Sequence, residues 1–536
     1  MASSPSAPMT SMAARTMTSG LSVPRGARRR LTVRLVRDDD TGSLDSSETT
    51  IHPAITYAVL YHLLQRSRRL RGASMPISPA GVTESELREL CEKTIARLDI
   101  AGAQIAVAIG ETMVQAEAGV ANAERDTPVT AETTFQIGST TKVYTAVLMM
   151  QLADEGLVDL DRPVTDYLPD VRLATGEAWR TITPRLLMAM TSGLDNGPYT
   201  DTGRGDDAVA KYVALLERIP LVFAPGTAYG YSNASTNVSG LIVETLTGQC
   251  WDDVLRERIL GPAGLTESVS LFEELPYHRP AVGRLPGSDT VVRPWCFSRG
   301  MAPSGSSLAT TARDLARFGQ LFLRRGRAAD GTRILSEAAV ATMQTPQADV
   351  PSRVFADSWC VGPYRKVWGG VEVFGHSGTT HNGSSTLLWI PEHDVAVAVV
   401  VNTPPRGYPF ADAVFDAVLR DGLGLPKPQR PEPDAGLTFD PDDYVGRYDA
   451  WGVRYDVARQ GGGLALTVRR MRDNDPATGE AEEPIHTLLH PIAPQRFLPA
   501  DDAVTGNHTW DIAFTAGADG RIALLHNGAF AARRGD

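Results

Sequence analysis

Ser139 and Lys142 stand three residues apart in Ser139-Thr-Thr-Lys142, directly after a short extended stretch. Residues three apart on a helix share a face, so this spacing places the lysine amine within reach of the serine hydroxyl. A serine becomes a nucleophile when a base takes its proton, and a desolvated lysine can be that base. Residues 143–155 carry helix formers and an apolar stripe, which predicts a helix whose first N–H groups would favour an oxyanion. Alone, the pattern also fits an exposed helix start.

Tyr231 and Asn233 form the second motif, Tyr231-Ser-Asn233. Pro225-Gly226 marks a turn before it, and a helical pattern begins at Ser235, so the motif is predicted on a loop that enters a helix. A phenolate near a lysine ammonium can take the nucleophile's proton, and the asparagine amide can hold a substrate carbonyl. Taken alone, the motif is explained more simply by a turn with a buried tyrosine and an asparagine cap.

His376, Gly378 and Thr379 form the third motif, at the end of an extended run. Residues 384–391 and 395–402 are predicted to be neighbouring strands. The backbone N–H of an edge strand can serve as a second oxyanion donor, and a glycine there lets a substrate approach closely. Without this context, His376 is an ordinary histidine at a strand end.

Together and in this order, the three motifs resemble the serine β-lactamase and penicillin-binding-protein superfamily. The closest likeness is to its class C-like branch, which includes family VIII esterases and D-aminopeptidases. Residues 186–194 and 304–318 agree with it, and the resemblance covers about residues 83–422. It implies that Ser139 is the acylated nucleophile and Lys142 its base partner. The remaining implied roles are proton relay for Tyr231, substrate contact for Asn233, and an oxyanion hole from the N–H groups of Ser139 and Thr379.

His376 departs from the resemblance, because lysine usually holds that position. A neutral imidazole offers less charge to a substrate carboxylate than an ammonium does. The departure favours ester or amide substrates over strong β-lactam hydrolysis. We also expect an ionisation near neutral pH in the activity, one that His376→Ala would remove.

The predicted fold class is α+β, with strands at both ends of the catalytic region and helices between them. This order fits an antiparallel sheet flanked by helices, with an all-helical lobe and the nucleophile in the crevice between them. Residues 83–424 are assigned to this domain, opened by the capping-box pattern Thr83-Glu-Ser-Glu86. Helices are predicted at about 83–98, 184–190, 206–217, 235–247, 309–324 and 411–419.

Two further regions flank the predicted catalytic domain. Residues 425–438 are proline-rich and are predicted to be a linker. Residues 439–536 contain regularly spaced short strands, which indicate a small antiparallel barrel that resembles the lipocalin-like domains appended to some enzymes of this superfamily. Residues 1–82 are predicted either to be a disordered extension or to result from a misassigned start codon. In the second case, Met75 is a plausible true start.

Composition narrows the function classes. With 536 residues and 42% hydrophobic residues, the chain can bury a large core, and its net charge of −11 argues against coating nucleic acid. No secretory signal or membrane span is recognised, so the predicted location is the cytoplasm. The four cysteines lack metal-ligand spacing, and no metal or organic cofactor is expected. The oligomeric state is open.

The sequence therefore predicts a serine hydrolase that forms an acyl-enzyme on small esters, amides or peptides. Three alternatives stay open. A transacylase would use the same acyl-enzyme with an alcohol or amine in place of water. A non-catalytic penicillin-binding-like sensor would keep the motifs without turnover. An α/β-hydrolase would use Ser377, although its surroundings do not match the strand-to-helix elbow of that fold.

Overall fold

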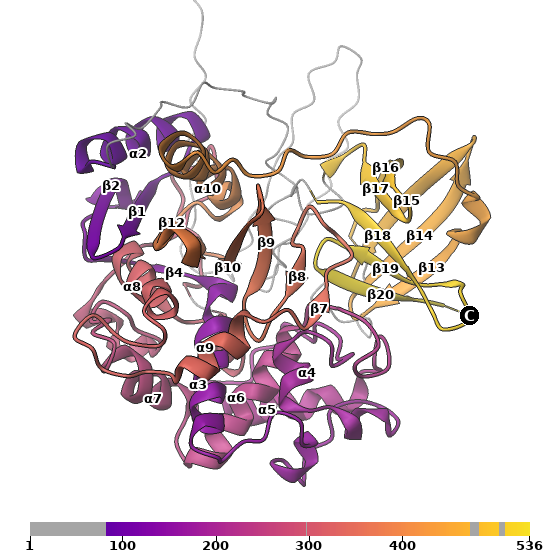
Figure 1. Cartoon of the computed structure of the whole chain (residues 1–536), viewed down its shortest axis with the longest axis horizontal. Coiled ribbons are helices and arrows are strands. Elements are labelled where there is room, and N and C mark those ends of the chain that lie inside the picture. Colours follow the sequence, from indigo (N-terminus) through magenta and orange to yellow (C-terminus); the bar gives the residue numbers. More distant parts are fainter. Residues whose placement is uncertain (1–81, 296, 472–481, 503–509, 536) are drawn as a thin grey trace, which may run out of the picture. The chain divides into compact units, whose positions relative to one another are not determined.

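The central feature of the computed structural model is an antiparallel sheet; the structure describes residues 82–295, 297–471, 482–502 and 510–535. Its strand order is β3-β2-β1-β12-β11-β10-β9-β8-β7 (Figure 1). The bounds are β1 (Gly102–Ile109), β2 (Thr112–Asn122), β3 (Thr127–Pro128), β7 (Ala348–Asp349), β8 (Ser358–Trp359), β9 (Tyr364–Trp368), β10 (Val371–Thr379), β11 (Ser384–Ile390) and β12 (Val395–Val401). Because β1 pairs with β12, the sheet is built from the two ends of the region, as predicted.

The central strand β12 is buried on both faces of the sheet. Alternate residues of a strand face opposite sides of the sheet. Because both sides of β12 are covered, all of its residues are apolar. Val395, Val397 and Val399 share a core with α2 (Glu84–Leu98) and α10 (Gly407–Phe415). The smaller Ala396 and Ala398 face the core that contains α8 (Ala312–Leu323).

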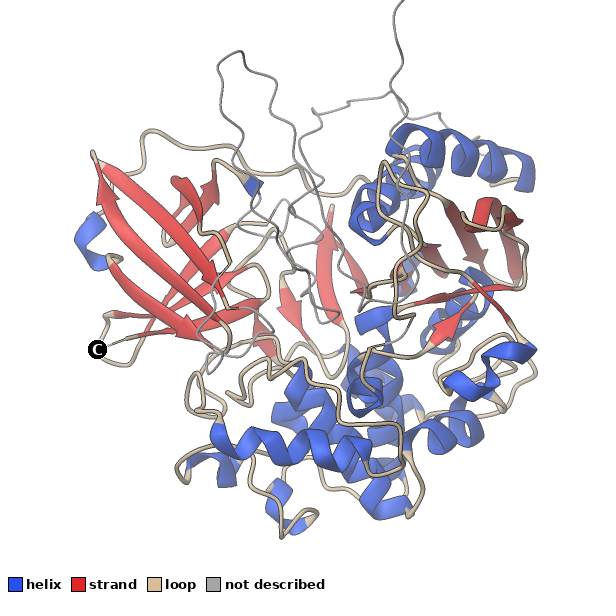
Figure 2. Cartoon of the chain, turned by 180° about the vertical axis from the view of Figure 1, so that it is seen from behind, coloured by secondary structure: helices blue, strands red, loops and turns tan. Residues whose placement is uncertain are grey.

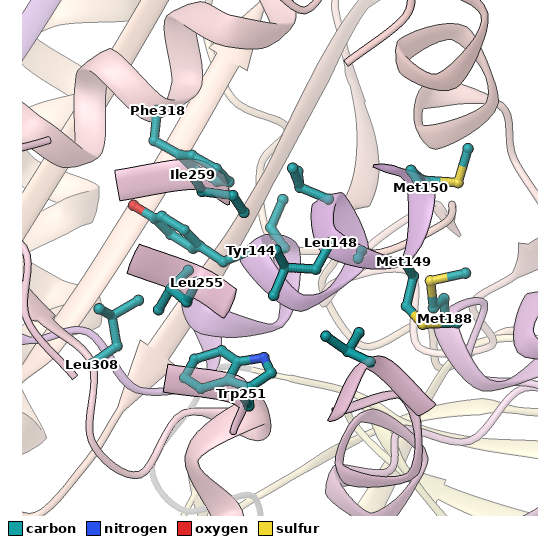
Figure 3. Close-up of a cluster of buried hydrophobic side chains, with 14 of the residues drawn as sticks. Tyr144, Leu148, Met149, Met150, Met188, Trp251, Leu255, Ile259, Leu308 and Phe318 are labelled. Atoms are coloured by element: carbon teal, nitrogen blue, oxygen red, sulfur yellow. The ribbon is translucent and has the colours of Figure 1, made fainter. Parts of the chain in front are cut away.

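The helical lobe packs around α3 (Thr141–Asp154) and α6 (Asn233–Thr247), and Figure 2 shows its helices in blue. The other helices are α4 (Pro184–Met188), α5 (Ala208–Ala214), α7 (Trp251–Leu255) and α9 (Glu337–Gln344). The sequence predicts an apolar stripe after Lys142, whereas α3 is buried on nearly all sides, as expected of a central helix. Tyr144 stacks on Phe318 with ring centres 3.6 Å apart in the core that Figure 3 shows. This core fixes the helix that carries Lys142.

A small sheet leads the chain into that helix. It consists of β4 (Thr133–Gln136) between β5 (Arg279–Pro280) and β6 (Ala309–Thr310). A turn at Gly138–Thr140, called the Ser139 turn below, connects β4 to α3.

The predicted elements agree well with the observed ones in this sheet-and-helix part. Thr83 and Glu86 form the capping box that starts α2. The predicted helices each correspond to an observed one, although their ends differ by a few residues. Helices α7 and α9 were not predicted, because they are short and their burial comes from distant segments.

The C-terminal barrel is confirmed as a closed antiparallel barrel of eight strands, β13 to β20, within the described residues. Their bounds are β13 (Gly446–Ala450), β14 (Val453–Gln460), β15 (Gly463–Arg470), β16 (Ile485–Ala493), β17 (Arg496–Pro499), β18 (Ile512–Ala516), β19 (Ile522–Asn527) and β20 (Phe530–Arg534). The short strands that the sequence predicts at 444–448, 455–459, 464–469, 509–515 and 521–525 correspond to β13, β14, β15, β18 and β19, whereas β16, β17 and β20 were not predicted. Aromatic rings of Tyr444, Tyr448, Phe497 and Phe514 pack against one another inside it.

Residues 425–438 join the two parts without helix or strand, and the prediction for the extension at 1–82 falls almost wholly outside the described residues. No helix within the described ranges is long and apolar enough to cross a membrane. In the same ranges, no cluster of His, Cys, Asp and Glu could hold a metal ion. Cys91, Cys250 and Cys360 are free thiols.

Candidate active site

Ser139 and Lys142 meet at the junction of the Ser139 turn and α3. The Lys142 Nζ lies 3.0 Å from the Ser139 Oγ and donates a hydrogen bond of 2.7 Å to the carbonyl oxygen of Ser304. Lys142 is only 2% exposed, and this burial lowers the pKa of its amine well below the ordinary value. A carbonyl can only accept, so Ser304 holds one N–H and orients the amine. A neutral, oriented amine beside a serine hydroxyl can act as its base.

Tyr231 reaches the same serine from the loop before α6. Its hydroxyl is hydrogen-bonded with Ser139, and the Lys142 Nζ lies 4.9 Å from the centre of its ring. Burial raises the pKa of the Tyr231 phenol well above the ordinary value. Burial thus disfavours the charged forms of both groups in the expected pair of phenolate and ammonium.

Asn233 is the first residue of α6, whose N-cap is Ser232. Its Nδ2 donates to the hydroxyl of Tyr199 at 3.1 Å, and Asn196 donates to the same hydroxyl at 3.2 Å. The Asn196 Oδ1 accepts a hydrogen bond from the Asn233 backbone N–H at 3.1 Å. Asn196 and Tyr199, which were not predicted, thus fix the Asn233 amide at the wall of the cavity.

Gly378 lies where β10 touches the Ser139 turn. A Cβ at Gly378 would stand 2.0 Å from the carbonyl oxygen of Ile137 and 2.4 Å from the backbone nitrogen of Ser139. A Cβ at Gly138 would likewise stand 2.4 Å from the Thr379 nitrogen. The expectation that Gly378 makes room for substrate needs correction, because the close neighbour is the Ser139 backbone. This contact brings the Ser139 and Thr379 nitrogens together, the arrangement that an oxyanion hole requires.

His376 is almost fully enclosed, at 2% exposure, among the rings of Tyr231, Trp359 and Tyr364. Its Nδ1 lies 2.7 Å from the carbonyl oxygen of Ser377, which can only accept, so Nδ1 carries the proton. Burial lowers the pKa of His376 to about 3. An ionisation near neutral pH from this residue is therefore not expected, contrary to the sequence interpretation. Desolvation, which the sequence does not reveal, is the reason.

Ser377 does not occupy a strand-to-helix elbow. It lies within β10, and its Oγ is within hydrogen-bond distance of the Tyr364 hydroxyl (3.3 Å) and the Thr386 hydroxyl (3.2 Å). The α/β-hydrolase alternative therefore lacks its defining geometry.

A cavity of about 370 Å³ opens above Ser139, and both parts of the chain line it. The Tyr231 backbone N–H donates to the carbonyl oxygen of Ala529 at 3.0 Å, and the rings of Phe530 and Tyr231 meet edge to face at 5.5 Å. The Trp451 N–H donates to a carboxylate oxygen of Asp195 at 2.8 Å. Burial raises the pKa of that carboxyl to about 6.

Sequence reasoning missed these barrel contacts and the Ser304 carbonyl. Ser304 is 162 positions away from Lys142, and Ala529 is almost three hundred positions away from Tyr231. No local pattern predicts pairings over such separations. Trp451 and Phe530 offered only a weak signal, as aromatic residues next to strand ends.

Comparison with known proteins agrees with this geometry. Residues 87–420 match the family described as Beta-lactamase, which is well over half of the chain. The chain belongs to the β-lactamase family. It is 36% identical over 336 residues to "Penicillin-binding protein 4" of Amycolatopsis lactamdurans, covering 62% of this chain and 88% of that protein. It is 25% identical to "Unguisins hydrolase ungD'" of Aspergillus campestris, covering 60% of this chain and 62% of that protein. The resemblance to the class C-like branch is thus confirmed, and the chain is a hydrolase of this family.

Solved structures extend the match beyond the family domain. SurE, crystallised with D-Leu, superposes with a TM-score of 0.69 at 25% identity, covering 84% of this chain and 99% of SurE. D-amino acid amidase from Ochrobactrum anthropi superposes with a TM-score of 0.54 at 24% identity, covering 63% of this chain and 97% of the amidase, and shows a shared fold. The fold class predicted for the β-lactamase-family domain and the appended barrel is confirmed.

Proposed function

We propose that this chain is a serine hydrolase that forms an acyl-enzyme at Ser139 on small amides or esters with a D-configured aminoacyl group. The contact of 3.0 Å between the Lys142 amine and the Ser139 hydroxyl carries the proposal. Burial lowers the pKa of this amine and so favours its neutral form, whose lone pair can accept a proton.

In the acylation step, Lys142 accepts the Ser139 proton while the serine oxygen bonds to the substrate carbonyl carbon. The carbonyl oxygen becomes an oxyanion between the backbone N–H groups of Ser139 and Thr379. When the bond to the leaving group breaks, the Tyr231 phenol donates its proton to the departing nitrogen or oxygen. The Lys142 ammonium then returns a proton to Tyr231, so the proton count is restored.

Deacylation runs through the same groups. A water molecule loses a proton to the Lys142 amine and its oxygen bonds to the acyl carbon. The tetrahedral intermediate releases the Ser139 oxygen, which takes the proton back from Lys142. Asn233, fixed by Tyr199, presents its amide toward the acyl group. The amine or alcohol is released in acylation and the carboxylic acid in deacylation, and the enzyme returns to its starting state.

The substrate class is supported by two kinds of observation. Aromatic and aliphatic side chains form most of the cavity wall, which suits an apolar acyl side chain. SurE was crystallised with D-Leu and the Ochrobactrum enzyme is named a D-amino acid amidase, which favours D-configured substrates. The neutral His376 argues for weak β-lactam hydrolysis, because it offers no cation to a β-lactam carboxylate.

The first test is intact-protein mass spectrometry after incubation with a fluorophosphonate probe. Wild type and Ser377→Ala should each gain one adduct, and Ser139→Ala should gain none. An adduct that persists in Ser139→Ala would overturn the assignment of the nucleophile.

The second test compares the p-nitroanilides of D-leucine and L-leucine. We expect release of p-nitroaniline from the D-enantiomer at the higher rate and none from either with Ser139→Ala. Equal rates for both enantiomers would contradict the stereochemical part of the proposal and leave the acyl-enzyme standing.

A further inference from the structure

Arg470 occupies an unusual place at the end of β15. Leu464, Leu466 and Val468 alternate along this strand and are buried in the barrel core. Because alternate residues of a strand share a face, Arg470 continues the inward-facing row. Its partner across the ladder is Val453 on β14. Arg470 is thus an inward-facing cation at one end of a barrel whose core consists of aliphatic and aromatic side chains.

That end of the barrel opens onto the cavity above Ser139. Arg470, Tyr455 and Asn527 all line the cavity, and the Asn527 Nδ2 lies 3.4 Å from the Tyr455 hydroxyl. The adjacent residue Arg469 has the opposite orientation. It forms an ion pair of 3.0 Å with Asp456, and its side chain is 40% exposed. Of the two neighbouring arginines, Arg470 lines the cavity and Arg469 does not.

The charges around the cavity single out Arg470. Among the described residues that line it, Arg470 is the only lysine or arginine and Asp195 is the only carboxylate. His376 lines the cavity as well, but burial lowers its pKa to about 3 and leaves it neutral. Burial also lowers the pKa of Arg470, yet a guanidinium keeps its proton in proteins.

The environment of Arg470 suits an anionic ligand. Desolvation lowers the pKa of its guanidinium, while the Glu482 carboxylate nearby acts to raise it. A guanidinium has five N–H donors in a planar fork, more than a single carboxylate can use. Removal from water strengthens its attraction for an anion that enters the cavity. A planar carboxylate matches the fork in geometry as well as in charge.

We propose that Arg470 binds a carboxylate of the substrate, so that the barrel selects the charge of what Ser139 hydrolyses. This inference rests on the proposed function and adds a specificity-determining residue to it. The carboxylate can belong to the leaving group, as at the C-terminus of a peptide, or to the acyl side. Both sources present the same chemistry to the guanidinium.

Two pairs of substrates test the proposal and separate the two sources. D-leucyl-D-alanine and its C-terminal amide differ only in a carboxylate on the leaving group. The N-succinyl and N-acetyl p-nitroanilides of D-leucine differ by a carboxylate on the acyl side. In at least one of the two pairs, the wild-type kcat/KM should be about 10- to 100-fold higher for the substrate with the carboxylate than for the one without it. This is the range expected for a hydrogen bond between charged groups.

Substitutions at the two neighbouring arginines complete the test. In Arg470→Gln the preference should disappear, in Arg470→Lys part of it should remain, and in Arg469→Gln it should equal that of wild type. If wild type shows no preference in either pair, or Arg470→Gln keeps it, the inference is wrong. Should Arg470→Gln fail to fold, Arg470→Lys and the wild-type pairs decide.

Failure of the proposed function would look different. Wild type would then turn over none of the four substrates, and Ser139 would not react with the fluorophosphonate probe. Ser139 labelling together with equal rates on both members of each pair would instead reject only the role of Arg470.

Discussion

The surroundings of Ser139 and the barrel contribute to the same cavity in different ways. The sheet-and-helix part brings the Ser139 hydroxyl, the Lys142 amine and the Tyr231 phenol together. The barrel brings the Ala529 carbonyl, the Phe530 ring and the Arg470 guanidinium to the same cavity. The first set can move protons and form bonds, whereas the second can only hold or select. Variants of the two regions should therefore fail in different ways.

Lys142→Met should produce the largest effect. It removes the base while keeping an unbranched side chain in the buried site, so kcat/KM should fall by about 10³-fold or more on every substrate. Labelling of Ser139 by the fluorophosphonate probe should slow to a similar degree. Stopped-flow or quenched measurements of acylation check this.

Lys366→Met is the matched control for Lys142→Met. Lys366 is a half-buried lysine whose pKa desolvation lowers to about 8, and it lies on β9 outside the cavity lining. Its replacement should leave acylation unchanged. Equal losses in the two variants would mean that buried charge, and not base catalysis, explains the effect.

Gly378→Ala should come second, with a loss in kcat of about 100-fold, the effect of removing one oxyanion donor. The added Cβ would meet the Ser139 nitrogen at 2.4 Å and force the two oxyanion donors apart. Gly462→Ala, where a Cβ meets open space, is the control and should behave as wild type. A KM effect with unchanged kcat would argue against the oxyanion role of this contact.

The difference between the two regions also explains what the sequence could predict. Ser139 and Lys142 lie within one helical turn, so their spacing alone indicates their contact. The fold class follows from strand and helix patterns of ordinary length. The charge states of Lys142, Tyr231 and His376 depend on burial by distant segments, and no local pattern contains that information.

The barrel strands also differ in how well the sequence predicts them. The β14 and β15 strands alternate clearly and were predicted, whereas β17 has only four residues and β16 contains a proline and a shift in register. Phe530 begins β20, and nothing in its sequence neighbourhood indicates that its ring meets Tyr231. Such pairings exist only once the chain has folded.

Phe530→Ala should have a moderate effect, a roughly two- to tenfold fall in kcat, since an aromatic pair contributes about 0.5–1.5 kcal/mol. The loss should appear in kcat more than in KM, because the Phe530 ring packs edge to face against the Tyr231 ring while the Ser139–Lys142 contact stays intact. Leu488→Ala, on an exposed barrel position (40% exposed), should change neither constant. If Phe530→Ala altered KM alone, the barrel would form a wall for substrate without positioning Tyr231.

His376→Gln should have the smallest effect, and it tests whether every motif residue takes part in the chemistry. As pH falls, the Lys142 amine takes up a proton and stops acting as a base, so activity is present at higher pH and lost toward acid. His376, with a pKa of about 3, is neutral across that range and cannot set the midpoint of the loss. The profile of kcat/KM against pH should therefore keep its acidic limb at the same midpoint in the variant, with at most a lower plateau. If the midpoint shifts or the acidic limb disappears in the variant, His376 is the group whose ionisation controls activity, as the sequence suggests.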